Sequence, residues 1–241
     1  MVKVGVVSNS PTLSKAIGVF LISRGYYVNH IFSDQANNGE FDVFVIDVDG
    51  INKMFPEQGF SVVGKISETK KYIILVTSEK SPAKLKELLQ KGVSGIVDSA
   101  LQPYYISEKI YEILQTLPIK DDDKRKHYRV KVDYGLLRVE ILPNRVIEGQ
   151  VFDVSAGGVS ANFRTEEEAN MFINNKAYPC ELIFGNVVVK TKVFLVRRDA
   201  LFCGFRFFGL DEKQLLRLSE FIYHSIIEST RGLPKASELT R

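Results

Sequence analysis

The sequence predicts two structural classes in succession: a doubly wound α/β unit with a parallel sheet, then a six-stranded antiparallel β-barrel with a closing helix. Two observations carry this prediction. Short apolar runs alternate with amphipathic segments through residues 2–117, which is typical of a parallel sheet covered by helices. After residue 130, strand-like runs follow one another with only turn signals between them, which is typical of a small barrel.

Length and composition limit the class of protein. The chain has 241 residues, 45% of them hydrophobic and 25% charged, which suits two small domains with cores of their own. No apolar run approaches the roughly 20 residues of a membrane-spanning helix, and the first residues lack the pattern of a signal peptide. Cys180 and Cys203 have no CxxC spacing, as expected for buried, reduced thiols. We therefore expect a cytoplasmic protein without a membrane span.

Five apolar runs in the first half are predicted strands. Each is short and almost continuously apolar, as in strands that are covered on both faces. They are residues 2–7, 26–32, 41–48, 72–77 and 93–97.

Helices are predicted between these strands where a cap precedes a helical spacing of apolar residues. Ser10-Pro11 and Ser81-Pro82 each join an N-cap residue to a proline in the first turn, and Gly25 and Gly92 end the two helices. A last helix is predicted from four residues that share one face, namely Ile106, Ile110, Ile113 and Leu114.

The charge distribution places a linker near the middle of the chain. Residues 1–118 carry equal numbers of acidic and basic residues, whereas residues 125–241 carry an excess of four basic ones. Between them, residues 121–129 form a charged strip with no apolar residue before Tyr128, which cannot bury itself. We expect a first domain over 1–118, a linker over 119–124, a barrel domain over 125–230 and a loose tail over 231–241.

In the second half, six predicted strands are separated by turn signals such as Pro143-Asn144 and Gly185-Asn186. They cover residues 130–142, 146–154, 159–163, 178–184, 187–196 and 201–208. One helix is predicted after Asp211, which with Gln214 resembles a capping box. Its apolar face comprises Leu215, Leu218, Ile222 and Ile226.

Two short elements of this half carry the functional chemistry. Arg125 and Arg129 are four residues apart in Arg-Lys-His-Tyr-Arg, and 24 residues later follows Asp153-Val-Ser155-Ala-Gly-Gly158. In this order they resemble the RxxxR and [D/N]xSxxG motifs of PilZ domains. The resemblance covers about residues 124–228, including the strand with Gly204-Phe205-Arg206-Phe207 and the closing helix.

This resemblance implies a receptor for cyclic di-GMP. The implied ligand-binding positions are Arg125, Arg129, Asp153, Ser155 and Gly158, with Lys124, Lys126 and Gly157 as further candidates. The residue types suit that ligand, because arginine binds guanine O6 and N7 bidentately and an ionised aspartate accepts from guanine N–H donors. Ser155 is a candidate to donate to a phosphate or to orient Asp153. Gly157 and Gly158 permit a turn with positive φ and a close approach of the ligand to the backbone.

Other interpretations of the two elements stay open at this point. The basic strip is also typical of a solvated linker, or of a nucleic-acid contact with His127 and Tyr128 stacking on bases, although the second motif argues against nucleic acid. Residues 153–158 are also typical of a tight turn closed by a side-chain hydrogen bond. We find no nucleophile–base arrangement and no metal constellation, so the sequence predicts neither an enzyme nor a metal site.

Residues 2–117 resemble the receiver domain of two-component response regulators, but several acidic residues of that family are replaced. Asp47 matches the phosphoacceptor at the end of the third strand, and Thr77 matches the hydroxyl residue of the fourth. Ser8 and Asn9 stand where the family has acids that hold Mg²⁺, and Ser99 or Gln102 replaces its lysine. One carboxylate with two neutral side chains is a poor Mg²⁺ site. Asp47 is thus interpreted as a vestigial phosphoacceptor, and the unit as a protein-binding or dimerising module.

The sequence therefore predicts a non-enzymatic bacterial signalling effector. In this hypothesis cyclic di-GMP orders the charged strip, the two domains change their relative orientation, and the receiver-like domain transmits the signal to a protein partner, a homodimer being one arrangement. The helix that begins near Tyr104-Tyr105 is a candidate contact face. The alternative is a response regulator gated by phosphorylation of Asp47, with an interaction or nucleic-acid-binding output domain.

Overall fold

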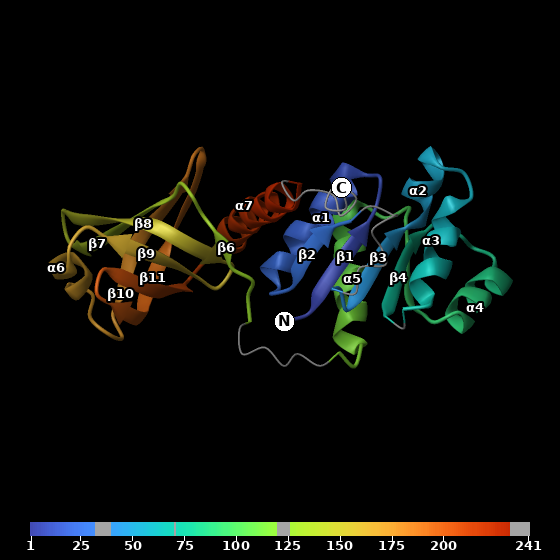
Figure 1. Cartoon of the computed structure of the whole chain (residues 1–241), viewed down its shortest axis with the longest axis horizontal. Coiled ribbons are helices and arrows are strands. Elements are labelled where there is room, and N and C mark those ends of the chain that lie inside the picture. The colour runs from blue at the N-terminus through green and yellow to red at the C-terminus, as the bar shows by residue number, and fades with distance from the viewer. Residues whose placement is uncertain (32–39, 70, 120–125, 232–241) are drawn as a thin grey trace, which may run out of the picture. The chain divides into compact units, whose positions relative to one another are not determined.

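The computed structural model describes residues 1–31, 40–69, 71–119 and 126–231 (Figure 1). They group into compact units, with Met1–Lys126 in one and His127–Ser229 in the other.

The first unit is an α/β layer structure, as the sequence predicts. Its sheet is parallel with the order β2-β1-β3-β4-β5. This is the doubly wound order in which ligand sites lie at the carboxyl ends of the strands. Its elements are β1 (Lys3–Val7), α1 (Pro11–Ser23), β2 (Tyr27–His30), β3 (Val43–Asp47), α2 (Val48–Met54), α3 (Gln58–Ser67), β4 (Tyr72–Thr77), α4 (Pro82–Gln90), β5 (Val93–Asp98) and α5 (Pro103–Thr116).

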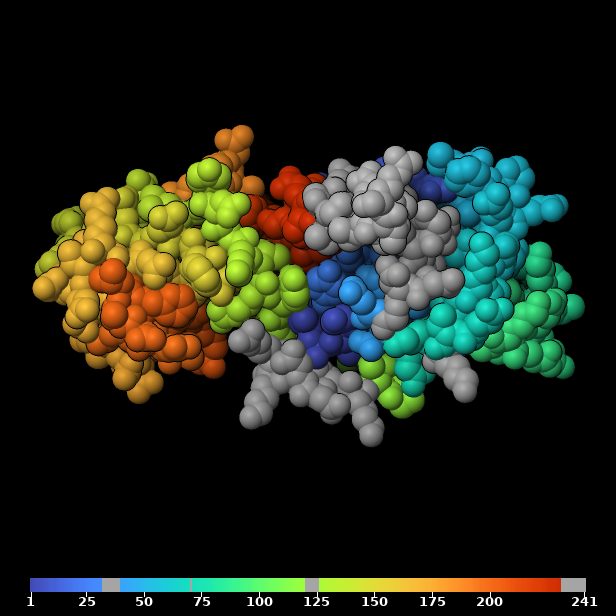
Figure 2. Space-filling view, in the orientation of Figure 1, coloured from blue at the N-terminus to red at the C-terminus, as the bar shows by residue number. Residues whose placement is uncertain are grey.

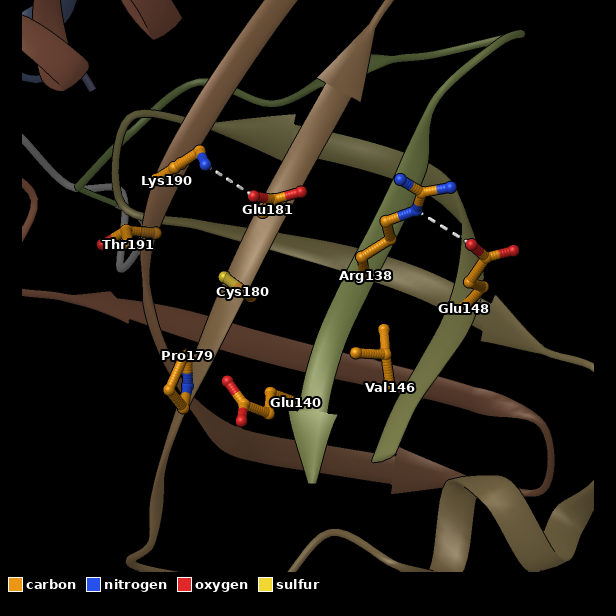
Figure 3. A pocket seen from close by; sticks show the side chains of 9 residues that line it. All are labelled: Arg138, Glu140, Val146, Glu148, Pro179, Cys180, Glu181, Lys190 and Thr191. Atoms are coloured by element: carbon orange, nitrogen blue, oxygen red, sulfur yellow. Dashed lines mark hydrogen bonds and ion pairs between the residues drawn. The ribbon is translucent and has the colours of Figure 1, made fainter. Parts of the chain in front are cut away.

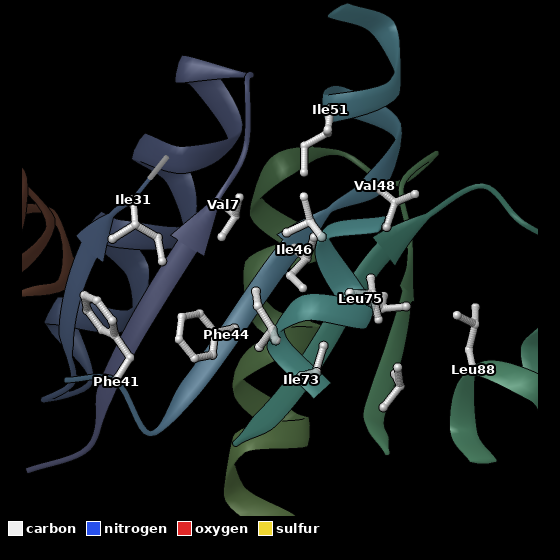
Figure 4. Packing of buried hydrophobic residues seen from close by; sticks show 14 residues of the cluster. Val7, Ile31, Phe41, Phe44, Ile46, Val48, Ile51, Ile73, Leu75 and Leu88 are labelled. Atoms are coloured by element: carbon white, nitrogen blue, oxygen red, sulfur yellow. The ribbon is translucent and has the colours of Figure 1, made fainter. Parts of the chain in front are cut away.

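Period-two alternation divides the strand side chains between the two faces of this sheet. Phe44, Ile46, Ile73 and Leu75 belong to one fully buried cluster, which side chains of α2, α3 and α4 complete (Figure 4). Helices α1 and α5 pack against each other and belong to a different layer of the unit. Because both faces are covered, the strands read as continuous apolar runs in the sequence.

Two helices of this unit, α2 and α3, are absent from the sequence prediction. Three glycines interrupt the segment, and Glu57 before α3 has a positive φ of 65°. These features obscure a helical face formed by Val62, Val63 and Ile66. Packing of that face on the sheet, rather than helix propensity, stabilises α3.

The second unit is a closed antiparallel barrel (Figure 1), and Figure 2 shows one face of its surface in the same orientation. Six strands pair in the order β8-β7-β10-β11-β12-β9, and pairing of β9 with β8 completes the ring. The elements are β6 (Val130–Lys131), β7 (Leu136–Leu142), β8 (Arg145–Ser155), β9 (Gly158–Phe163), α6 (Glu166–Asn170), β10 (Ala177–Phe184), β11 (Val187–Asp199), β12 (Phe202–Phe208) and α7 (Glu212–Arg231).

Aromatic side chains fill the barrel. Phe172 packs edge-on against Phe205 and Tyr178, with ring centroids 4.8 and 5.4 Å apart, and all three are almost completely buried. Helix α7 lies against the barrel through Phe221, whose ring stacks on Phe184 at 4.1 Å. The barrel is thus a packed core, and any ligand binds on its outside.

Two details of the barrel differ from the prediction. The expected strand 130–142 is interrupted, because β6 pairs with Asp153–Val154 of β8 and β7 pairs with residues 145–150. Between them, Val132 and Gly135 still hydrogen-bond to the β8 backbone, but residues 132–135 are not strand. Helix α6 is additional: Thr165 caps it by accepting a hydrogen bond from the N–H of Glu168.

None of the helices in the described part of the chain combines the length and apolar composition needed to cross a membrane.

Candidate functional site

The DxSxxG element forms the β8–β9 hairpin of the barrel. Ser155 pairs with Gly158 across the turn, and Asp153 pairs with Ser160. Val159 and Ala161 on either side of Ser160 are fully buried in the core, so Ser160 points to the outer face. Asp153 and Ser160 are therefore cross-strand neighbours on the outward-facing side of the sheet, where Ser160 is nevertheless completely buried.

Asp153 is the centre of this site. Its Oδ1 accepts a hydrogen bond from Arg129 Nη1 at 2.7 Å and another from Ser160 Oγ at 2.7 Å. The Arg129 side chain is 37% exposed and that of Asp153 is 17% exposed, so the pair lies at the protein surface. The structure thus joins the second arginine of the RxxxR element to the acid of the DxSxxG element.

The structure describes only some of the other basic residues of the predicted site. Arg125 and Lys124 lie outside the described residues, and Lys126, which directly precedes the barrel unit in the sequence, is exposed. Lys131 of β6 pairs directly with Asp153, on the strand edge opposite to Ser160. Arg206 of β12 pairs with Gly158 and is exposed.

Ser155 lies at the start of the hairpin turn. Its hydroxyl lies 3.3 Å from the Gly158 carbonyl oxygen and 3.3 Å from the Gly157 N–H, so it closes the hairpin turn. This is the contact that the tight-turn interpretation predicts. Orientation of Asp153 comes from Ser160 instead.

The two glycines of the turn serve packing rather than an unusual backbone conformation. Neither Gly157 nor Gly158 has a positive φ, so the expectation of such a turn is wrong. A Cβ on Gly158 would lie 2.2 Å from the carbonyl oxygen of Phe205, and one on Gly157 would lie 2.6 Å from the His127 ring. Close approach of the β12 backbone therefore requires glycine at position 158, whereas at position 157 a Cβ would require the His127 ring to shift.

Sequence reasoning missed Ser160, Lys131 and Arg206 as members of this surface. A signal for Ser160 was present: a two-residue turn after Ser155 places residue 160 opposite residue 153. The positions of Lys131 and Arg206 depend on which strands pair with β8 and β9, and the local sequence does not specify that pairing.

In the first unit, Asp47 is buried, and both of its carboxylate oxygens accept hydrogen bonds. It is 4% exposed; its Oδ2 accepts from Ser8 Oγ at 2.6 Å and its Oδ1 accepts from the Gly50 N–H at 2.9 Å. Asp47 is thus the N-cap of α2. Gly50 is required beside it, because a Cβ there would lie 2.0 Å from Asp47 Oδ2.

Asp49, which the sequence prediction did not single out, occupies the carboxyl ends of β3, β4 and β5. It accepts hydrogen bonds from Ser99 Oγ at 2.5 Å, from the Ser78 N–H at 2.7 Å and from Thr77 Oγ1 at 3.2 Å. Burial would raise the pKa of Asp49, but these hydrogen bonds outweigh it and lower the pKa below its usual value. Thr77 and Ser99, which stand at positions of the receiver resemblance, are thus both hydrogen-bonded to Asp49.

The described residues hold no group of three or more metal-ligating side chains. A pocket of about 520 Å³ lies on the outer face of β7 and β10, away from the β8–β9 hairpin (Figure 3). Ion pairs Arg138–Glu148 and Lys190–Glu181, each 2.8 Å long, cross it. Its cations are thus already neutralised, and Asp153 lies outside it.

No family model and no curated protein matches this chain. Among solved structures, the chain is similar to the PilZ domain of YcgR from Escherichia coli with c-di-GMP, at 16% identity and a TM-score of 0.40, over 45% of this chain and 95% of that one. It is also similar to chemotaxis protein CheY4 of Vibrio cholerae, at 24% identity and a TM-score of 0.39, over 47% and 98%. A receiver domain from Methanospirillum hungatei matches at 18% identity and 0.39, over 48% and 94%.

The strand order of the first unit and the ring closure of the second define the two fold classes independently of these likenesses. The chain combines a receiver-like unit with a PilZ-like barrel.

Proposed function

We propose that this chain is a non-enzymatic bacterial signalling effector that binds cyclic di-GMP on the outer face of its barrel. The single observation that carries the proposal is the contact of Arg129 with Asp153 beside Ser160. An arginine fork and an aspartate held side by side match the two kinds of group on a guanine edge.

Asp153 and Arg129 bind different groups of the same guanine. Within the part of the chain that the structure describes, Asp153 Oδ1 is occupied by Arg129 and Ser160, whereas Oδ2 accepts no hydrogen bond. Oδ2 is then the acceptor for the guanine N1–H and N2–H₂ donors. Arg129 uses one nitrogen on Asp153, and its remaining N–H groups donate to O6 and N7 or to a phosphate.

The phosphodiesters bind the cations around this pair. Lys131 and Arg206 flank the hairpin on opposite sides, and Lys126 precedes it. By the sequence motif, Lys124 and Arg125 add to them. Such an excess of positive charge suits a dianionic ligand, and its contribution weakens with salt.

Transmission follows from where the arginines stand in the sequence. Arg125 belongs to the segment that joins the two units, so a ligand that engages Arg125 together with Arg129 orders this connection. The relative orientation of the units then shifts because the two orientations differ in affinity for the ligand. A protein partner binds the receiver-like unit, for which Tyr104 and Tyr105 on α5, 47% and 51% exposed, offer a contact face.

Isothermal titration calorimetry with cyclic di-GMP tests the proposal. Wild type should bind with micromolar or tighter affinity. Arg129→Ala should bind about 5- to 150-fold more weakly, since a bidentate guanine contact contributes about 1–3 kcal/mol. Arg138→Ala is the matched control, because Arg138 also forms an exposed ion pair on the outer face, 2.8 Å from Glu148, but outside the site.

A wild-type chain that shows no binding contradicts the proposal, and so does an Arg129→Ala variant that binds like wild type. Small-angle scattering with and without ligand tests the transmission step separately. An unchanged scattering curve at saturating cyclic di-GMP contradicts reorientation while leaving binding intact.

A further inference from the structure

An aromatic patch adjoins the candidate site on the outside of the barrel. Phe152 is 46% exposed, and its ring meets that of Phe202 edge-on with centroids 6.1 Å apart. The Arg197 guanidinium lies over the Phe202 ring, with Cζ 5.9 Å from the centroid. Two phenylalanines and an arginine thus form a surface of flat groups in contact with solvent.

The strand registers make this patch continuous with Asp153. Phe152 immediately precedes Asp153, at a register irregularity of β8 that adds one residue opposite β9. Such a bulge turns two successive side chains toward one face. Across β9, Ser160 pairs with Gly204 of β12, and Gly204 pairs with Arg197 of β11.

Gly204 lies between Ser160 and Arg197 on the outward-facing side of the barrel sheet, and it is itself buried. A Cβ there would lie 3.7 Å from Arg197 Cβ, an ordinary contact, so packing does not require glycine. Gly158 on the neighbouring strand differs, because its Cβ would collide with backbone.

The ion pair of Arg197 with Asp199 leaves the plane of the Arg197 guanidinium accessible. Its contact with Asp199 is 3.2 Å long and both side chains are 68% exposed, so the pair contributes little to stability. Phe202 and Arg197 present a ring face and a guanidinium plane, on which nucleic-acid bases stack.

We propose that Phe152, Phe202 and Arg197 form a stacking platform for one guanine of the ligand. Asp153 accepts hydrogen bonds from the edge of the same guanine. This inference rests on the proposed function and deepens it. Stacking adds affinity for the base face, which the hydrogen bonds of Arg129 and Asp153 do not contact.

Because the chain contains no tryptophan, a single introduced tryptophan reports on stacking directly. Phe202→Trp should lose fluorescence when cyclic di-GMP is added to the full chain, since a stacked guanine quenches indole emission. Leu142→Trp is the control, at a side chain that is 50% exposed on β7 and outside the patch. Its emission should stay constant through the same titration.

Calorimetry completes the test. Phe202→Ala and Phe152→Ala should weaken binding about fivefold to 100-fold, which corresponds to the effect of removing one stacking partner. Leu142→Ala should bind like wild type.

The outcomes separate the two proposals. If wild type binds and Arg129→Ala binds weakly, but both alanine variants match wild type and Phe202→Trp is not quenched, the platform is refuted and the proposed function stands. If wild type does not bind at all, both are refuted. Quenching together with weakened Phe202→Ala binding supports the platform.

Discussion

Removing the Asp153 carboxylate should destabilise the barrel, and removing Ser160 as well should restore part of the loss. Ser160 is completely buried, and Asp153 accepts its only hydroxyl hydrogen at 2.7 Å. In Asp153→Ala this hydroxyl loses its partner, although it stays in a site from which water is excluded. The carboxylate therefore matters to stability mainly through Ser160.

The magnitude follows from the two contacts of Asp153. A hydrogen bond to a charged acceptor contributes about 1.5–3 kcal/mol. The ion pair with Arg129 adds about 0.2–1 kcal/mol, because the Arg129 side chain is 37% exposed. Asp153→Ala should thus lower the free energy of unfolding by about 2–4 kcal/mol. In Asp153→Ala/Ser160→Ala no hydroxyl is left unpaired, so the double variant should be about 1 kcal/mol more stable than the single one.

Urea titration followed by far-ultraviolet circular dichroism and tyrosine fluorescence measures these changes, with the slope of the transition checked for constancy. The four proteins of the cycle give the coupling free energy between the two side chains. If the double variant loses the sum of the single losses, Ser160 and Asp153 act independently and the reasoning fails. Ser160→Ala alone should lose less than Asp153→Ala.

Gly158→Ala should lower the free energy of unfolding by at least about 1–3 kcal/mol, because the new methyl group would collide with β12. Gly204→Ala should stay within about 1 kcal/mol of wild type. Equal urea midpoints for the two variants would contradict this distinction. Acetyl phosphate with Mg²⁺ should leave the mass of the chain unchanged, because Asp47 is 4% exposed and capped on both oxygens; a phosphorylated species that Asp47→Ala abolishes would revive the response-regulator alternative. Burial raises the pKa of Cys180 to about 12 and that of Cys203 to about 11, from 9.0. Unfolded thiols ionise first as pH rises, so stability should fall above about pH 9, and neither native thiol should react with Ellman's reagent at pH 8.

Much of the fold could be predicted because its patterns are local. Proline and serine mark the start of α1, where Ser10 accepts from the Leu13 N–H at 3.3 Å. Asp211 caps α7 through the Gln214 N–H at 2.7 Å, as the capping-box pattern predicts. The α/β unit and the six-stranded barrel with its helix are confirmed. Helices α2 and α3 were missed, because their glycines weaken the local signal and tertiary packing compensates.

The candidate site was predictable to a smaller extent. Arg129 and Asp153 were each identified as ligand-binding positions by their motifs, but their contact with each other was not predicted. Whether they bind a ligand is a prediction that the titration tests. Ser160 was recoverable from the length of the turn. In the first unit, no local pattern distinguishes Asp47, which caps α2, from Asp49, which holds the ends of three strands.

The sequence by itself determined the two structural classes, the neutral and basic halves, and the residues that resemble a cyclic di-GMP site. Only the tertiary structure decided which of these side chains meet. It assigned Ser155 to the turn and Ser160 to Asp153, and it placed Phe152, Phe202 and Arg197 beside them. Strand register sets these contacts, and register results from packing of the whole barrel core around Phe172 and Phe205 rather than from any short segment.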